Sequence, residues 1–263
     1  MTELVKLGAI EEVEILTMVD QKQSFPNHYH KDFCISLITE GIECMKVHER
    51  YIYSEKDHVS ITNPNEIHSN PLVPTEKKLC FHTLYIPENI MMEVAGTKNI
   101  RFENRSFKDL QLNAYFLDLV RAAKYSGDEV QHQLLRKIIN RLVEHSIDKI
   151  ANDHLTFKAG WEQVITYVDE NLKNKISLTT LSSNFEMDKF KFAKSFKYLF
   201  GMSPMNYVLM KRIFKAKEMI SINTNLTDLA YEYDFTDMSH FSKQFKRFVG
   251  LSPKQFQKGI IQD

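Results

Sequence analysis

The C-terminal part of the chain contains two copies of one short pattern. Residues Ser195–Pro204 (SFKYLFGMSP) align with Gln244–Pro253 (QFKRFVGLSP) at an offset of 49. Farther upstream, the segments that begin at Leu178 and Leu226 align at an offset of 48. A period of about 50 residues indicates that each copy is one structural unit, so the fold of this part must contain the same unit twice.

Each copy is typical of a short helix, a tight turn and a longer helix. We expect helices at residues 179–184 and 188–200 in the first copy, and at 227–233 and 237–248 in the second. Apolar residues recur on the longer helices at the i, i+4, i+7 spacing of a buried stripe. The predicted buried residues are Phe192, Phe196 and Leu199, followed by Phe241, Phe245 and Phe248.

The opposite face of each longer helix is small, polar or basic. Such a helix can enter the major groove of double-stranded DNA, where lysines meet phosphates or guanine edges and small side chains permit close approach. Outward-facing lysines are more often merely solvated, but a solvated helix does not need a duplicated pattern. The predicted DNA-binding residues are Lys189, Phe190, Ala193, Lys194 and Lys197, with Met238, Ser239, Ser242, Lys243 and Lys246 in the second copy.

Both copies end in a Gly-x-Ser-Pro motif, GMSP in the first and GLSP in the second. Gly201 and Gly250 can adopt the left-handed conformation just past a helix end, and Pro204 and Pro253 suit the first position of the next helix. We expect a long helix from Pro204 to about Ile222 that links the two units. It would hold two DNA-reading helices in successive major grooves, roughly 34 Å apart on one side of B-DNA.

At these residues the chain resembles the AraC/XylS family of bacterial transcription regulators. The resemblance covers about 100 residues, from Trp161 to Phe256, and is carried by AKEMI at 216–220, DLAYEYDF at 228–235 and HFSKQFKRFVGLSP at 240–253. It implies base-reading positions at Phe190, Ala193 and Lys194, and at Met238, Ser239, Ser242 and Lys243. Two departures are Ser182, where the family usually has alanine, and Asp234, where it usually has glycine before the phenylalanine.

Charge divides the chain in two. Residues 161–263 hold 15 Lys and Arg against 11 Asp and Glu, whereas residues 1–160 hold 19 against 23. The basic excess coincides with the repeat, as expected if only that half meets a polyanion. We expect a sensor and dimerisation domain at 1–150, a linker at 151–160 and a DNA-binding domain at 161–263.

The sequence of the N-terminal half predicts short strands separated by turns. The predicted strands are Val13–Val19, Phe33–Thr39, Ile42–His48, Tyr51–Tyr53, His58–Thr62 and Leu79–Ile86. Their regular spacing favours a small barrel or a double-sheet jelly roll at about residues 10–90. The residues His28 and His30, then Glu40-Gly41, then NPNEIH at 63–68 resemble the cupin-type sensor domain of many members of the same family. The predicted fold is therefore α+β, with a cupin-like barrel and a C-terminal double helix-turn-helix.

The barrel histidines have two interpretations. They hydrogen-bond within the barrel or line a pocket for an uncharged or anionic small-molecule effector, or three imidazoles, those of His28, His30 and His68, hold a metal ion. Metal cupins usually place a glutamate four or five residues after the second histidine, but here Cys34 and Ile35 occupy those places. We therefore expect no metal, no other cofactor and no catalysis. The candidate effector-binding residues are His28, His30, Cys34, His68 and His82.

Two amphipathic helices are predicted at residues 107–125 and 129–147. The stripe Leu110, Leu117 and Val120 marks the first helix, and residues such as Val130 and Ile138 mark the second. This hairpin can cover the open edge of the barrel, or, as in the resembling family, form the contact of a homodimer.

The cellular location is predicted from sequence features of exported and membrane proteins. Cys34, Cys44 and Cys80 form no paired framework, and neither a signal peptide nor an apolar run of membrane-spanning length is visible. We expect a soluble cytoplasmic protein without a membrane partner.

Three functions remain open. The chain is a ligand-responsive transcription regulator with DNA, an effector, a second copy and RNA polymerase as partners; or a regulator controlled by a protein partner; or a cupin enzyme with a DNA-binding tail. The missing glutamate disfavours the enzyme.

Overall fold

The computed structural model describes residues 2–8, 10–74, 78–97, 99–147 and 161–260. They form two compact units, one built mainly from the N-terminal half and one from the C-terminal half, and each is described by itself. The expected linker at 151–160 lies outside the described residues. Among those residues, every helix is too short or too polar to cross a lipid bilayer.

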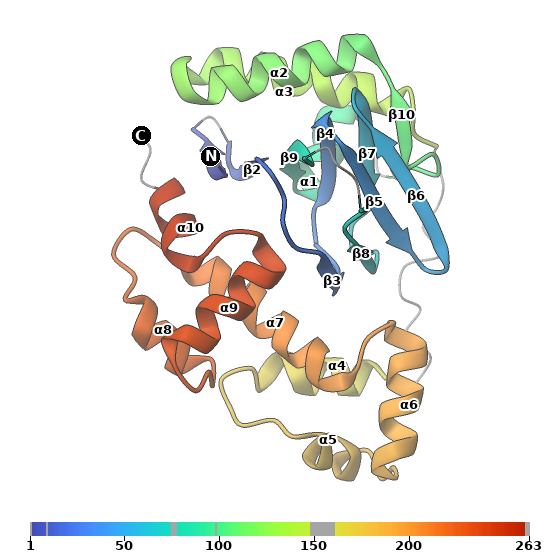
Figure 1. The fold of residues 1–263 in the computed structure, drawn as a ribbon, viewed down its shortest axis with the longest axis vertical. Coiled ribbons are helices and arrows are strands. Elements are labelled where there is room, and N and C mark those ends of the chain that lie inside the picture. Colours follow the sequence, from blue (N-terminus) through green and yellow to red (C-terminus); the bar gives the residue numbers. More distant parts are fainter. Residues whose placement is uncertain (1, 9, 75–77, 98, 148–160, 261–263) are drawn as a thin grey trace. The chain divides into compact units, whose positions relative to one another are not determined.

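The N-terminal unit contains two antiparallel sheets (Figure 1). The six-stranded sheet has the order β1-β2-β9-β4-β7-β10 and the four-stranded sheet has the order β3-β8-β5-β6. The strands of the first are β1 (Glu3–Leu7), β2 (Ile10–Met18), β9 (Cys80–Ile86), β4 (Phe33–Glu40), β7 (His58–Thr62) and β10 (Ser106–Lys108). Those of the second are β3 (Phe25–His28), β8 (His68–Asn70), β5 (Ile42–Val47) and β6 (Arg50–Glu55); β3 itself is grouped with the C-terminal unit. Of the two predicted alternatives, a small barrel and a double-sheet jelly roll, the two sheets correspond to the second, and all six predicted strands are present.

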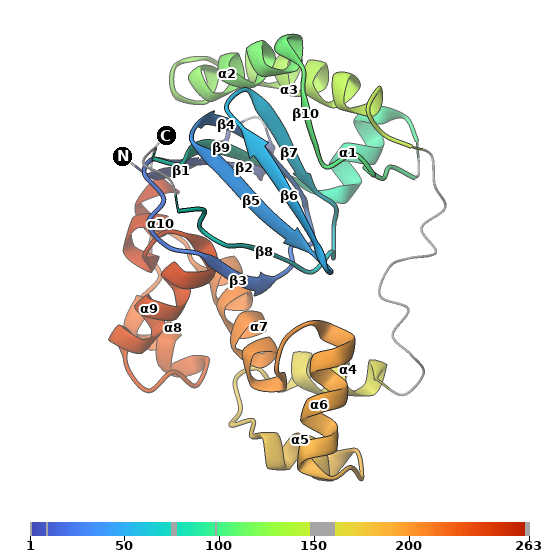
Figure 2. The same cartoon turned by 45° about the vertical axis from the view of Figure 1, so that its right-hand side comes forward.

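Three helices complete this unit: α1 (Glu88–Ala95), α2 (Leu110–Tyr125) and α3 (Asp128–Val143). They pack against one face of the six-stranded sheet and enclose the main apolar core, to which Ile35, Leu84 and Phe116 belong. Figure 2 shows β5 and β6 in front of the strands of the larger sheet, with α2 and α3 running along its end. Because residues of α2 and α3 share one core with alternate residues of β2, β4, β7 and β9, the helical hairpin covers a sheet face and not an open edge.

The stripe predicted for α2 was wrong. Leu110 and Leu117 are exposed, whereas Leu112, Phe116 and Leu119 are fully buried. Both sets have helical spacing, so periodicity alone could not choose between them. The structure buries the set that contains the phenylalanine, which removes more apolar surface from water.

The C-terminal unit is all helical and repeats one motif. Its helices are α4 (Glu162–Glu170), α5 (Leu178–Asn184), α6 (Lys189–Phe200), α7 (Pro204–Met219), α8 (Leu226–Glu232), α9 (Met238–Val249) and α10 (Pro253–Gly259). The pairs α5/α6 and α8/α9 are the two predicted units, and α7 is the predicted link. Buried phenylalanines line the inner face of α6 and α9 as expected, except that Phe200 is buried in α6 where Leu199 is only half-buried.

Candidate nucleic-acid interface and effector site

Short polar side chains fix where α6 and α9 begin. The Asp188 carboxylate accepts hydrogen bonds from the backbone amides of Phe190 (2.9 Å) and Lys191 (3.0 Å). Asp237 accepts one from the His240 amide at 2.7 Å. Such caps satisfy amide groups that have no partner inside the helix. The two helices thus start in the same way in both copies.

Glycine ends both helices. Gly201 has φ 64° and Gly250 has φ 85°, the left-handed conformation that a side chain would disfavour. Pro204 and Pro253 then open the next helices, as predicted from the GMSP and GLSP motifs.

The structure gives α6 and α9 an outward face that matches the candidate DNA-binding set. Phe190 is 80% exposed at the start of α6, and Ala193 is half-buried one turn later. The lysines and one serine of the set are exposed, namely Lys189, Lys194, Lys197, Ser239, Lys243 and Lys246, whereas Met238 and Ser242 are half-buried. Basic and small side chains therefore occupy one face, and the phenylalanine stripe occupies the other.

A buried arginine, which sequence reasoning missed, joins the linking helix to the rest of this unit. The Arg212 guanidinium donates hydrogen bonds to the backbone carbonyls of Leu172 (Nε, 2.9 Å) and Asn174 (Nη2, 2.6 Å). The same Nη2 lies 2.8 Å from the Asp234 carboxylate. The available signal was a single arginine at an otherwise apolar position, between Met210 and Ile213.

Both departures from the family pattern have a local explanation. Asp234 adopts φ 59°, and aspartate tolerates this conformation better than most residues. Its carboxylate also pairs with Arg212, which glycine could not do. Ser182 is buried, and its hydroxyl donates to the Thr179 carbonyl within the same helix at 3.1 Å.

The two faces of the six-stranded sheet differ in chemistry. Phe33, Ile35 and Leu37 on β4 belong to the apolar core under the helices. Because side chains alternate along a strand, Cys34 and Ser36 point to the opposite face. That face, here called the inner face, meets the four-stranded sheet: the Thr62 hydroxyl lies 3.2 Å from the Met45 sulfur.

The inner faces of the two sheets are polar and buried. The Ser36 and Thr83 hydroxyls are 2.7 Å apart, and the Ser54 hydroxyl donates to that of Ser106 at 2.8 Å. Polar residues of these faces with less than a tenth of their surface exposed are Ser36, Ser54, Ser60, Thr62, Thr83, Glu43 and His68. An interior of this kind suits a polar ligand better than an apolar one.

Two of the candidate effector-binding histidines, His30 and His68, lie side by side, with ring centroids 5.5 Å apart. The third, His28, lies on β3, which is grouped with the C-terminal unit. The Nδ1 atoms of His28 and His68 lie 2.6 and 2.9 Å from the carbonyls of Pro26 and Glu66. Burial lowers the pKa of His68 to about 4, so its imidazole is neutral at pH 7.

The other two candidates are placed differently. Cys34 is buried on the inner face, and its thiol is 3.8 Å from the Asp32 carbonyl. His82 is separated from this group, because it alternates with Phe81 and Thr83 onto the face that bears the helices. Its Nδ1 contacts the Thr17 hydroxyl at 2.9 Å, and burial followed by the charge of Lys124 on α2 lowers its pKa.

Two buried carboxylates were also missed. Glu43 on β5 accepts a hydrogen bond from Asn70 Nδ2 at 3.1 Å and another from Ser60. Glu66 pairs with Arg105 at 2.6 Å and with Arg101 at 3.8 Å. Glu43 belongs to no motif, and Glu66 stands within NPNEIH without having been a candidate site residue, so only the structure brings the two carboxylates to attention.

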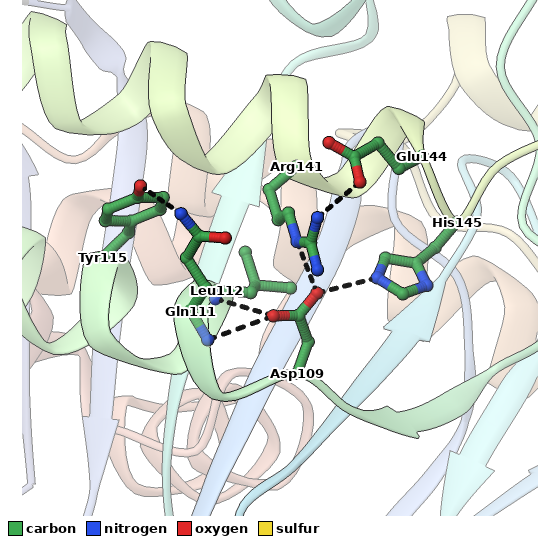
Figure 3. A network of polar contacts seen from close by, with 7 residues as sticks. All are labelled: Asp109, Gln111, Leu112, Tyr115, Arg141, Glu144 and His145. Carbon is green, nitrogen blue, oxygen red and sulfur yellow. Dashed lines mark hydrogen bonds and ion pairs between the residues drawn. The ribbon is translucent and has the colours of Figure 1, made fainter.

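The helical hairpin is held together by a network around Asp109 (Figure 3). One carboxylate oxygen caps α2 by accepting from the amides of Gln111 and Leu112, at 3.1 and 3.0 Å. The other lies 2.7 Å from Arg141 Nε on α3 and 2.9 Å from His145 Nε2. Burial alone would raise the pKa of Asp109, but these hydrogen bonds lower it to about 2.

Comparison with protein-family models gives two matches. Residues 14–140 match a model described as an AraC-like ligand binding domain, and residues 181–259 match a model described as a helix-turn-helix domain. Between them the two matches cover most of the chain and correspond to its two units.

Individual proteins resemble the chain over different lengths. The transcriptional activator RhaS of Escherichia coli is 20% identical over 263 aligned positions, covering 89% of this chain and 88% of RhaS. The probable transcriptional regulator LumQ of Photobacterium leiognathi is 28% identical, but the match covers only 51% of this chain and 62% of LumQ. The crystal structure of an apo ToxT variant from Vibrio cholerae shares the fold with a TM-score of 0.59 at 11% identity, over 95% of this chain and 98% of ToxT.

Proposed function

The chain belongs to the AraC family of transcription regulators, and from this premise we propose that it reads two adjacent major-groove segments of double-stranded DNA under the control of a small-molecule effector. The observation that carries the proposal is the pair of helices α6 and α9, each capped by an aspartate, ended by a glycine and with a basic or small outward face. The reading set is Phe190, Ala193 and Lys194 on α6, with Met238, Ser239, Ser242 and Lys243 on α9. Lys189, Lys197 and Lys246 would contact phosphates.

The experiment is a selection of bound sequences from random duplex DNA with the full chain, followed by footprinting of the selected sites. We expect two protected major-groove segments one helical turn apart on the same side of the duplex. A protein carrying Lys194→Ala and Lys243→Ala should lose the selected consensus. Its matched control carries Lys215→Ala and Lys254→Ala, two exposed lysines outside the reading helices. Failure to select any sequence would reject the proposal.

The N-terminal barrel is proposed as the effector-binding part. Its match to an AraC-like ligand binding domain and its buried polar inner faces support this role. ToxT of Vibrio cholerae has been crystallised with an unsaturated fatty acid, at a TM-score of 0.51 and 13% identity to this chain. The inner faces of the present barrel carry many hydroxyls and a buried carboxyl, which favour a smaller and more polar ligand.

A transition-metal ion is the second candidate ligand of the barrel, with His28, His30 and His68 as its candidate ligands, of which His30 and His68 lie side by side. The Nδ1 contacts of His28 and His68 with backbone carbonyls are of the kind that orients metal-binding histidines. Among the described residues no glutamate joins this cluster, and Cys34 stands near the expected position of one. Native mass spectrometry with elemental analysis of the purified protein decides between a metal and an organic ligand.

We further propose that two copies associate through α2 and α3 and act in the cytoplasm, where bacterial DNA and RNA polymerase are found. Exposed apolar residues on this hairpin, Leu110 and Leu117 among them, support association. The relatives are transcription regulators, which supports a role without catalysis.

A further inference from the structure

The buried carboxyl of Glu43 is the polar group of the inner faces whose contacts are least complete. Only 5% of the residue is exposed, and its Oε2 atom has no hydrogen-bond partner among the described residues. Its other contacts are with neutral side chains, those of Ser60 and Asn70. A buried acceptor without a partner costs about 1 to 3 kcal/mol, so such groups often mark ligand sites.

Acidic groups lie around Tyr85, which shares the inner face with Glu43. Burial raises the pKa of Tyr85 well above its usual value, and the electrostatic influence of Cys34, Glu14, Asp32 and Glu43 raises it further. Tyr85 lies on the inner face, opposite Cys34 in the register of β4 and β9. The nearby arginines do not offset this charge at Glu43, since Arg105 and Arg101 pair with Glu66.

We propose that the inner faces of the two sheets bind a small organic ammonium ion and that Glu43 is its counter-ion. This rests on the proposed role of the barrel as the effector-binding part. An ammonium group donates to the unpartnered Glu43 Oε2, and the Ser60 and Thr62 hydroxyls can accept its remaining hydrogen bonds. The aromatic ring of Tyr85 provides a further attractive surface for a cation.

The test compares primary amines of two to six carbon atoms with the alcohols that replace each amino group by a hydroxyl, for example 1,4-diaminobutane with 1,4-butanediol. Each compound is titrated into the full chain by calorimetry and by thermal unfolding. We expect at least one amine to bind and to raise the melting temperature, and its alcohol counterpart to bind about tenfold more weakly or worse.

The variant Glu43→Gln keeps the shape of the side chain and removes the charge. It should fold, because it replaces a buried acid by a neutral group, and it should lose amine binding by about tenfold or more. The control is Glu55→Gln on the neighbouring strand, an exposed glutamate, which should bind the amine as the unmodified chain does.

Three results would overturn the proposal: no response to any amine, equal binding of amine and alcohol, or full amine binding by Glu43→Gln. A melting temperature raised by zinc or nickel alone would instead assign the barrel to the histidine cluster. DNA binding is measured on the same samples. Its persistence alongside a failed amine titration would refute the ammonium site and leave the proposed DNA-reading function standing.

Discussion

Single residues in this protein combine a conformational role with an electrostatic one. Asp109 caps α2 and also pairs with Arg141 and His145 on the far side of the hairpin. Asp234 occupies a left-handed turn position and also pairs with Arg212. Asp234 could be recognised from the sequence as a turn residue, whereas Asp109 was placed inside a helix predicted to begin at residue 107 and in fact caps a helix that begins at Leu110. The charged partners of both could not be recognised, because they lie far along the chain.

Asp109 should make the N-terminal unit sensitive to acid. Its pKa is about 2 in the folded chain, below its ordinary 3.8, so the stabilisation is complete above about pH 4 and is lost as the pH falls toward 2. The shift corresponds to about 2 kcal/mol. Asp109→Asn, which retains a capping oxygen, should remove this amount at pH 7 and flatten the dependence of unfolding on pH between 4 and 2.

Urea unfolding followed by circular dichroism at a series of pH values measures this effect. Asp118→Asn is the matched control, because Asp118 pairs with Arg121 on the same helix but is half exposed. A pH dependence of Asp109→Asn equal to that of the unmodified chain would contradict the prediction.

Arg212 should be the most sensitive polar position of the C-terminal unit. Arg212→Ala leaves two backbone carbonyls and the Asp234 carboxylate without their donor, which should destabilise the unit by about 2 to 4 kcal/mol. The single tryptophan, Trp161, packs against Phe192, Phe196 and Phe200, so its fluorescence reports unfolding of this unit alone.

The control for Arg212 is Lys215→Ala on the same helix, which removes an exposed pair with Glu218. It should leave the tryptophan transition nearly unchanged. If both substitutions shift that transition equally, the buried arginine has no special part in the fold.

At the scale of elements, the sequence predicts strongly periodic segments and misses short ones. The duplicated helices and their caps were found because the same spacing occurs twice. Strands β3 and β8 were not, since FPNH and HSN have neither alternation nor β-branched residues, and pairing with neighbouring strands gives them their conformation. The polar inner faces could not be predicted from the sequence either, because Glu43 and Ser60 become neighbours only when two sheets meet.

Some lysines of the two reading helices should contact bases, and others should contact phosphates. Lys243→Ala should reduce discrimination at one base pair by about 1 to 3 kcal/mol, because its exposed position on α9 suits contact with a base edge. Lys197→Ala, near the end of α6, should weaken binding to all sequences and lower the salt slope by about one.

Both variants are measured by titrating the selected site and its single-base changes at several salt concentrations. Each variant serves as the control for the other, because both remove one exposed lysine. A uniform loss of affinity for Lys243→Ala would exclude it from the base-reading set.

At the scale of the whole molecule, the chain separates a basic helical unit from an acidic sheet unit, and the helical hairpin α2/α3 exposes two leucines of one stripe. Leu110 is 78% exposed and Leu117 is 37% exposed, although both have the spacing of a packed stripe. The sequence could not say which stripe faces the sheet. The structure assigns the core to Leu112 and Phe116 and leaves Leu110 and Leu117 exposed.

Replacing Leu110 and Leu117 by charged residues should therefore disrupt association of two copies without changing the stability of the fold. A protein with Leu110→Lys and Leu117→Lys should keep its melting temperature, since neither side chain belongs to the core, but should sediment as a monomer. Its affinity for one half-site should be unchanged, while binding to paired half-sites should lose about ten- to a hundredfold, because the tether between two readers is removed. The matched control carries Tyr51→Lys and Tyr53→Lys, two residues on β6 that are 55% and 57% exposed. Added charge should disrupt association only where it lies in the dimer interface. If the dimer persists with the leucine changes and dissociates with the tyrosine changes, the interface lies on the four-stranded sheet and not on the helical hairpin.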